Sequence, residues 1–301
     1  MASLKEIRER KASVASTRQI TSAMKMVSAA KLRKAQDAIV QFRPYAEKLQ
    51  EILASVGDSI KDDEDNQFAV QRDKERILLV LLTSNRGLCG AFNSNAIKAS
   101  IHRALTQYET QMMASQVDFI AIGKKGADFL RKKGYKIIFD GSDLFDDLTF
   151  ERVATIANMI MGLFTDEEYD HVDMIYNRFK NAGTQILTVE QFLPIETEEI
   201  ASVSEPSAFV DYICEPSKEY IVQERIPRSL RLQFYKAILD SHASEHGARM
   251  TAMHKATDNA TELLKELSLQ FNKARQASIT VSYTHLRAHE TALRISYAVF
   301  C

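Results

Sequence analysis

Two long segments, one toward each end of the chain, hold almost no residues that interrupt helices. Residues 2–56 contain no glycine and a single proline, Pro44, and residues 227–280 contain a single glycine, Gly247. Because glycine and proline are the residues least favoured inside helices, each segment is predicted to form one long helix. Helices of about 40 and about 50 residues are roughly 60 and 75 Å long, which exceeds the width of a small domain.

Apolar residues recur every three or four positions along both segments, with two slips in the first. In the second segment these positions are Ala248, Ala252, Ala256, Ala260, Leu263, Leu267, Phe271 and Ala274. A long helix with one apolar stripe needs a partner to cover it, and these two helices can cover each other if they run antiparallel. We therefore predict an N-terminal coiled-coil helix over residues 1–57 and a C-terminal one over residues 227–280.

Between the two segments, short apolar runs alternate with stretches of helical spacing. The predicted strands are residues 76–83, 117–122, 136–139, 174–179 and 184–192, and the predicted helices are residues 95–113, 124–133 and 150–164. This alternation is typical of an α/β domain with a mainly parallel sheet, predicted for residues 75–195. Pro206 and Pro216 mark residues 196–226 as a linker or edge region. The predicted fold class is α/β: a long antiparallel coiled coil of the terminal helices plus a central Rossmann-like α/β domain.

The chain contains no glycine-rich phosphate-binding motif, since neither GxxxxGK[ST] nor GxGxxG occurs. The nearest feature is GKKG at residues 123–126, where two lysines at a helix N-terminus could attract an anion. An ordinary turn between a strand and a helix is the favoured interpretation. We therefore expect no cofactor.

Two further patterns invite a catalytic or metal-binding interpretation. Cys89 lies in the run RGLCG, residues 86–90, but no histidine or asparagine is indicated to pair with its thiol, so a strained turn that presents a contact loop is favoured. His242, Glu245 and His246 could place two imidazoles on one helix face, yet HExxH order and a third ligand are absent. A solvated helix face is favoured there. We expect neither catalytic residues nor a metal site.

The net charge of −1 conceals a segregation along the chain. Residues 1–48 carry 11 Lys and Arg against four Asp and Glu, residues 225–280 carry nine against five, and residues 49–224 carry 17 against 30. Basic ends favour an acidic partner, which could be nucleic acid, anionic lipid or an acidic protein loop. Tryptophan is absent and few aromatic residues lie in the basic segments, which disfavours single-stranded nucleic acid. No stretch is long and apolar enough to span a bilayer.

Three separated motifs resemble those of a known family. They are residues 7–36, which contain ASVASTRQITSAMKMVSAAKLRKAQ, residues 83–93 (TSNRGLCGAFN) and residues 245–280, which end in NKARQASIT. In order and spacing they resemble the gamma subunit of the bacterial rotary F-type ATP synthase. The resemblance covers residues 1–280, and a helical rod on an α/β base, as predicted above, is the architecture of that family.

The resemblance implies a non-catalytic central rotor shaft, one copy per complex. Its coiled coil would lie inside a hexamer of alpha and beta subunits, and its base would rest, with the epsilon subunit, on the membrane-embedded, proton-driven ring. The chain would then be a peripheral membrane protein on the cytoplasmic face of the bacterial inner membrane, with no nucleic acid among its partners. The matching motifs imply that this chain contacts the beta subunit at three places. These are Arg275, Gln276 and Thr280; Met24 and Lys25; and Arg86 and Cys89.

Residues 281–301 (VSYTHLRAHETALRISYAVFC) depart from the family, which normally ends in a tip rich in glycine and alanine. We expect them to be foreign rather than native family sequence. The alternative function is a basic coiled-coil protein that binds nucleic acid or an acidic membrane surface. A second rival, an α/β enzyme with helical dimerisation arms, lacks a phosphate loop or an identifiable acid–base pair.

Overall fold

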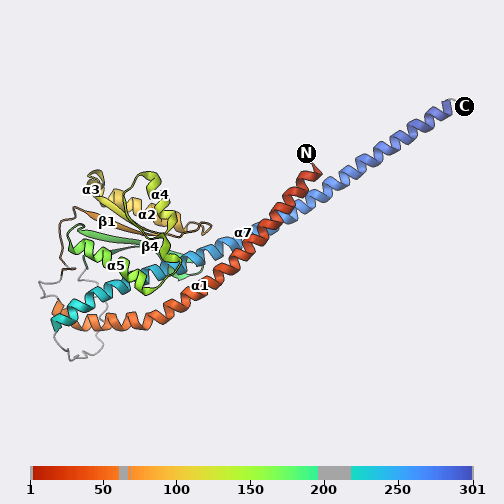
Figure 1. The fold of residues 1–301 in the computed structure, drawn as a ribbon. Helices are drawn as coiled ribbons and strands as arrows, with labels where there is room; N and C mark the ends of the chain where they lie inside the picture. Colours follow the sequence, from red (N-terminus) through yellow and green to blue (C-terminus); the bar gives the residue numbers. More distant parts are fainter. Residues whose placement is uncertain (1–2, 61–66, 69, 196–217, 300–301) are drawn as a thin grey trace. The chain divides into compact units, whose positions relative to one another are not determined.

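The computed structural model describes residues 3–60, 67–68, 70–195 and 218–299 (Figure 1). The chain forms two compact units. Residues 1–27 with 252–301 form the helical unit, and residues 28–251 form the sheet unit. Two long helices, α1 and α7, contribute to both.

Helix α1 spans Leu4–Ile60 and helix α7 spans Lys218–Val299. Helix α1 ends three residues beyond its predicted bound, and α7 extends beyond its predicted bounds at both ends. Helix α7 begins ahead of Pro227, a favoured first-turn residue, because the residues just before this proline contain no helix breaker. Residues 281–299 also lack glycine and proline, and the helix continues through them. Of the predicted linker, residues 196–217 lie outside the described residues, and the rest begins α7.

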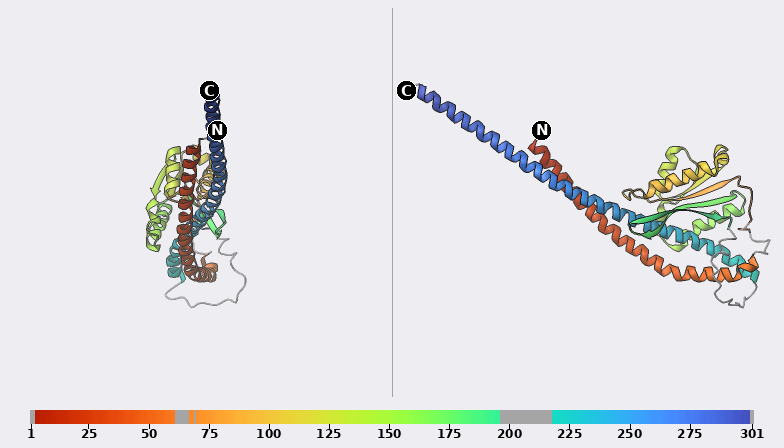
Figure 2. Two further views of the ribbon diagram at one scale, coloured as in Figure 1. Left: turned by 90° about the vertical axis from the view of Figure 1, so that its right-hand side faces the viewer. Right: turned by 180° about the vertical axis from the view of Figure 1, so that it is seen from behind.

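Within the helical unit, α1 and α7 run antiparallel (Figure 2). Contacts between described residues of the two helices show this direction, because the partner's number on α7 falls as the number on α1 rises. The pairs are Arg8 with Phe271, Thr21 with Thr257, and Lys25 with His254. The predicted antiparallel pairing of the terminal helices is confirmed.

Five strands form one sheet with the order β3-β2-β1-β4-β5. They span Ile77–Leu82 (β1), Val117–Ile122 (β2), Ile137–Asp140 (β3), His171–Asn181 (β4) and Thr184–Leu193 (β5). Neighbouring strands are parallel except β4 and β5, which form an antiparallel hairpin. All six residues of the central strand β1, ILLVLL, are buried, as expected for a strand covered on both faces. The mainly parallel sheet confirms the α/β fold class.

Helices cover both faces of the sheet (Figure 1). One core contains residues of α2 (Phe92–Thr106) and α4 (Lys124–Lys133), with the short α3 (Glu109–Met113) beside them. The other contains α5 (Phe150–Thr165) and the short helix η1 (Ser142–Phe145). Leu230, Phe234 and Ile238 of α7 belong to this second core. The first part of α7 is therefore built into the hydrophobic core of the sheet unit.

Helix α1 contacts α7 within the sheet unit as well. Leu32 and Ala35 of α1 form a buried cluster with Ala243 of α7. Farther along, the rings of Phe42 and Tyr235 meet edge to face with their centres 5.3 Å apart. Small alanine side chains let the two helix backbones approach closely, so this part of α1 is packed rather than solvated.

Candidate functional site

The N-terminus of α4 is closed by the turn that follows β1. Its first three N–H groups donate to that turn: Lys124 to Asn85 Oδ1 at 3.0 Å, Lys125 to the Ser84 carbonyl at 3.1 Å, and Gly126 to Thr83 Oγ1 at 2.9 Å. Gly123 has a φ of +111°, and a side chain there would collide with the Thr83 carbonyl. The interpretation of residues 123–126 as a strand-to-helix turn is confirmed, and the N–H groups that could hold an anion are bonded within the chain.

The segment between β1 and α2, residues 83–91, is the β1–α2 turn. Ser84 and Asn93 hold it from inside. The Ser84 N–H donates to Asn93 Oδ1 at 2.9 Å, Asn93 Nδ2 donates to Ser84 Oγ at 2.8 Å, and Ser84 Oγ donates to the Arg86 carbonyl at 2.7 Å. These reciprocal bonds restrict the turn to one backbone conformation.

Cys89 lies inside this network. Its side chain is 2% exposed and packs with Phe92 and Ala248. Asn93 Nδ2 donates to its Sγ at 3.3 Å, a partner that the sequence alone does not indicate. The buried thiol stabilises the turn from within, whereas the predicted contact residue Arg86 is exposed.

Arg249 of α7 reaches the same turn from the opposite side. Its Nη2 donates to the Arg86 carbonyl at 2.8 Å and its Nε to the Gly87 carbonyl at 3.3 Å. Its Nη1 lies 2.7 Å from the Glu245 carboxylate, and both side chains are more than nine-tenths buried. Burial raises the pKa of Glu245, and the Arg249 charge opposes that rise. The buried guanidinium of Arg249 thus binds the β1–α2 turn to α7.

Leu88 stands at the outer side of the turn. Its φ is +63°, in the left-handed region that leucine rarely adopts, and its side chain is 64% exposed. The surface that the turn presents is therefore made by Leu88 and Arg86 rather than by Cys89.

The predicted solvated helix face at His242, Glu245 and His246 is wrong. Glu245 and His246 are buried, and the His242 ring stacks on Phe145 with 5.8 Å between ring centres. Burial, together with the charges of Lys31 and Arg249, lowers the pKa of His242 to about 4, and burial and His242 lower that of His246 to about 3. The spacing alone does not show that η1 covers this face. Across the described part of the chain, no group of three metal-binding side chains is found.

The sheet contains one fully buried carboxylate that the sequence does not single out. Asp173 of β4 accepts hydrogen bonds from Arg103 Nε and Tyr108 Oη, each at 2.8 Å, and lies 3.0 Å from His171 Nε2. Burial alone would raise the pKa of Asp173, but the bonds from His171 and Arg103 hold it below its usual value. Because these groups saturate the carboxylate, we interpret the cluster as a stabilising network.

The other predicted contact residues belong to the helical unit. Arg275, Gln276 and Thr280 are exposed on α7, and Thr280 Oγ1 donates back to the Gln276 carbonyl at 2.9 Å. Met24 and Lys25 are half-buried on α1, and Lys25 Nζ lies 3.3 Å from His254 Nδ1. The predicted contact residues are thus exposed on α7 and half-buried on α1.

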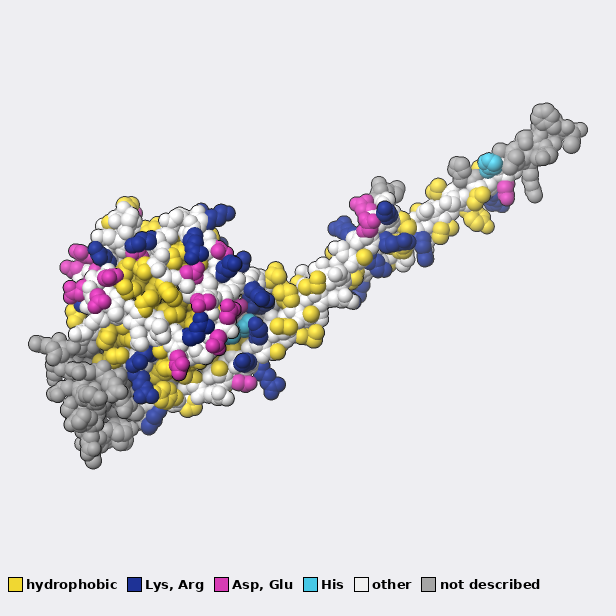
Figure 3. Space-filling model, viewed as in Figure 1, with side chains coloured by type: hydrophobic (Ala, Val, Ile, Leu, Met, Phe, Trp, Pro, Cys, Tyr) yellow, Lys and Arg dark blue, Asp and Glu magenta, His cyan; other side chains and the backbone are white. Residues whose placement is uncertain are grey.

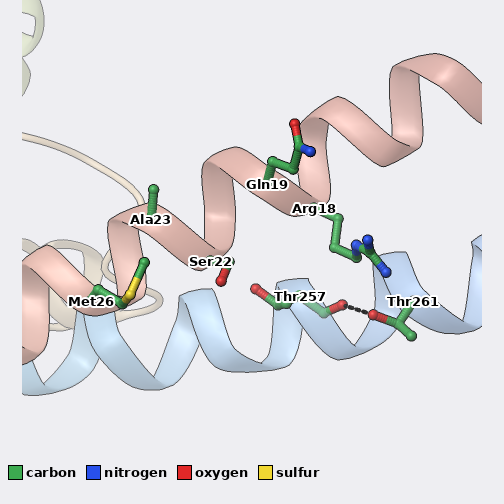
Figure 4. Close-up of a pocket in the computed structure, with 7 residues that line it drawn as sticks. All are labelled: Arg18, Gln19, Ser22, Ala23, Met26, Thr257 and Thr261. Atoms are coloured by element: carbon green, nitrogen blue, oxygen red, sulfur yellow. Dashed lines mark hydrogen bonds between the residues drawn. The ribbon is translucent and has the colours of Figure 1, made fainter.

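A shallow groove runs between the two helices of the helical unit (Figure 4). Thr257 and Thr261 of α7 line it, and the Thr261 hydroxyl donates to the Thr257 carbonyl at 2.8 Å. The α1 side is formed by Arg18, Gln19, Ser22, Ala23 and Met26. Arg18 is the one charged residue among these, so the groove is a mostly neutral, polar surface.

Charged side chains are distributed unevenly in the space-filling view. Figure 3 shows Lys and Arg side chains along both units, whereas most Asp and Glu side chains in this view lie over the sheet unit. The basic ends seen in the sequence therefore correspond to helix surface. Within the described residues, no helix has both the length and the apolar character needed to cross a membrane.

Comparisons with known proteins agree on one family. A family model described as ATP synthase matches residues 3–283. The chain is 52% identical over 280 residues to the ATP synthase gamma chain of Cytophaga hutchinsonii, which covers 93% of this chain and 95% of that relative. It is 57% identical over 282 residues to the ATP synthase gamma chain of Flavobacterium johnsoniae, with the same coverage.

Among solved structures, a chain of the central stalk and c-ring of the Tetrahymena thermophila mitochondrial ATP synthase is similar. It is 27% identical, with a TM-score of 0.57, and the similarity covers 79% of this chain and 99% of that one. None of these relatives is named as a binder of nucleic acid or of lipid. The alternative of a basic coiled-coil protein with such a partner is therefore not supported.

Proposed function

Because the chain belongs to the ATP synthase gamma chain family, we propose that it is the central rotor shaft of an F-type ATP synthase. It couples rotation of a proton-driven ring to the conformational cycle of three catalytic beta sites. The observation that carries this function is identity above one half to gamma chains over nearly the whole chain. The chain performs no catalysis itself.

The mechanism requires a shaft that contacts each beta subunit differently. A shaft without threefold symmetry makes different contacts with three otherwise equal sites and shifts the open–closed equilibrium of each one separately. Inverting one such equilibrium from 1:99 to 99:1 takes about 5.5 kcal/mol of differential contact energy. The paired helices of the helical unit supply a stiff element for this purpose, because each restricts bending of the other.

We assign the contacts with beta to three places. Arg275, Gln276 and Thr280 form polar contacts near one end, which their exposure on α7 supports. Met24 and Lys25 lie near an acidic beta loop, and the basic character of residues 1–48 supports that pairing. The β1–α2 turn is the third place: exposed Arg86 makes the contact there, and buried Cys89 holds the turn in shape.

The partners follow from this assignment. One copy of the chain lies within the alpha–beta hexamer, and residues 75–195 form the base that meets the epsilon subunit and the membrane ring. The complex holds the chain at the cytoplasmic face of the bacterial inner membrane as a peripheral protein. Residues 1–57 and 227–280 form the coiled-coil shaft.

Residues 281–301 stand apart from this shaft, and we propose that they are foreign sequence. The match to the family model ends at residue 283, although some gamma chains align over 97–98% of this chain. The described side chains from 281 on are exposed. Sequencing the 3′ end of the gene from source DNA tests this point, and a genuine stop codon after these codons would overturn it.

Native mass spectrometry tests the proposed function. The chain is co-expressed with alpha and beta subunits of a related bacterium, once at full length and once cut after Thr280. We expect a complex of three alpha, three beta and one copy of the chain. Absence of the complex with both forms, while alpha and beta are folded and competent with their own gamma chain, would contradict the rotor assignment. Loss with the full-length form alone would identify residues 281–301 as the obstacle.

A further inference from the structure

Leu88 combines two unfavourable features at one position. Three non-glycine residues among those described have positive φ: Leu88, Ser115 and Glu167. Ser115 and Glu167 are polar residues on the surface, whereas Leu88 exposes 64% of a large apolar side chain. An unfavourable backbone conformation and an exposed apolar side chain occur together only at Leu88 among these three.

Among the described residues, no contact accounts for a leucine here. The turn is fixed by the N–H groups of α4, by Asn93 of α2 and by Arg249 of α7. None of these bonds involves the side chain of Leu88. A glycine at residue 88 would relieve the backbone strain, and a polar side chain would remove the exposed apolar surface. The leucine therefore has its use outside the chain, and strain of this kind is characteristic of functional sites.

Basic side chains lie near Leu88, which forms the tip of the β1–α2 turn. Arg86 is exposed two residues away, and Lys124 and Lys125 are exposed at the start of α4. Lys125 lies beside the turn, since a Cβ at Gly87 would lie 3.9 Å from its Cε. An apolar tip with a basic rim fits a partner surface in which carboxylates border an apolar recess.

We propose that Leu88 is an anchor residue that inserts into an apolar recess bordered by carboxylates on the beta subunit. The internal bonds of the β1–α2 turn hold the leucine in its binding conformation, so little ordering is required on contact. This proposal rests on the rotor function above. It adds a specific side chain and a recess of defined chemistry to the contact at this turn.

Leu88→Gly separates anchoring from folding. It removes the side chain and the backbone strain together, so the isolated chain should melt at a higher temperature while its complex with alpha and beta dissociates faster. Loss of one buried leucine predicts about a tenfold or greater increase in the dissociation rate. Leu88→Met, which keeps the apolar volume, should dissociate nearly as slowly as the unmodified chain.

Ser115→Gly is the matched control, because it relieves a positive φ of 57° at an exposed polar residue. It should also raise the melting temperature and leave the dissociation rate unchanged. If the unmodified chain forms the complex and Leu88→Gly dissociates at the same rate, the anchor is refuted and the rotor function stands. If the unmodified chain forms no complex, the rotor function itself has failed. A lower melting temperature for Leu88→Gly would show that the leucine serves the fold, and would also refute the proposal.

Discussion

Substitution of Arg249 by methionine should destabilise the sheet unit by about 3–5 kcal/mol, the usual cost of breaking a buried ion pair. The guanidinium side chain is 8% exposed and lies 2.7 Å from the carboxylate of Glu245, which is 9% exposed. Methionine keeps most of the apolar stem and leaves the carboxylate without its counter-ion. The Gly87 carbonyl loses its bond from Arg249 as well, whereas the Arg86 carbonyl keeps its bond from Ser84 Oγ.

The size of this loss should depend on pH. Burial raises the pKa of Glu245 and Arg249 lowers it, so the folded-state pKa rises further when the guanidinium is removed. A group with a raised folded-state pKa keeps its contribution to stability below its unfolded pKa and loses it as pH rises through the folded pKa. The Arg249→Met variant should therefore lose more stability, relative to the unmodified chain, at about pH 8 than at about pH 5.

Urea unfolding followed by far-ultraviolet circular dichroism measures the loss. The matched variant is Arg249→Met combined with Glu245→Gln, in which no buried charge remains. We expect a coupling free energy of about 2 kcal/mol between the two positions. A loss below about 1 kcal/mol at both pH values, or a double variant whose loss equals the sum of the two single losses, would refute the reasoning.

Three further predictions use other parts of the chain. A Cβ at residue 162 would meet open space, so Gly162→Ala should stabilise the protein by about 1 kcal/mol in urea unfolding. A Cβ at residue 247 would lie 3.2 Å from Ala182 in the β4–β5 turn, so Gly247→Val should destabilise the protein by about 1–3 kcal/mol. Because the pKa values of His242 and His246 are lowered in the folded chain to about 4 and about 3, stability should fall between about pH 7 and pH 4, and His242→Gln should flatten that fall in thermal melts. In reconstituted complexes, Arg275→Ala should reduce ATP synthesis more than Arg275→Lys does.

Local sequence patterns predict most elements of this fold. The run ILLVLL has no polar face, so it fits a strand covered on both sides, and the structure places it at the centre of the sheet. Strand β2 and helix α4 have the bounds that the sequence predicts, residues 117–122 and 124–133. In both cases a turn signal lies next to a clear apolar pattern.

Local patterns do not predict the features that depend on contacts between distant segments of the chain. The polar residues His242 and His246 look solvated on a helical wheel, but Phe145 of η1 stacks on His242, and no local pattern places η1 there. The pairing of Cys89 with Asn93 depends on the path of the β1–α2 turn, which spacing alone does not give. The helix ends also differ from the predicted bounds, because α1 continues through Gly57 to Ile60, and α7 begins ahead of Pro227 and continues past residue 280.

Direct observation of rotation tests whether the chain is the rotor. The alpha–beta hexamer is fixed to a surface, and a probe is attached to a cysteine introduced at Gln107, an exposed residue at the end of α2. With ATP supplied, we expect the probe to turn in one direction, with three pauses in each revolution. A probe that remains still while the same complexes hydrolyse ATP would show that the chain is not the rotor.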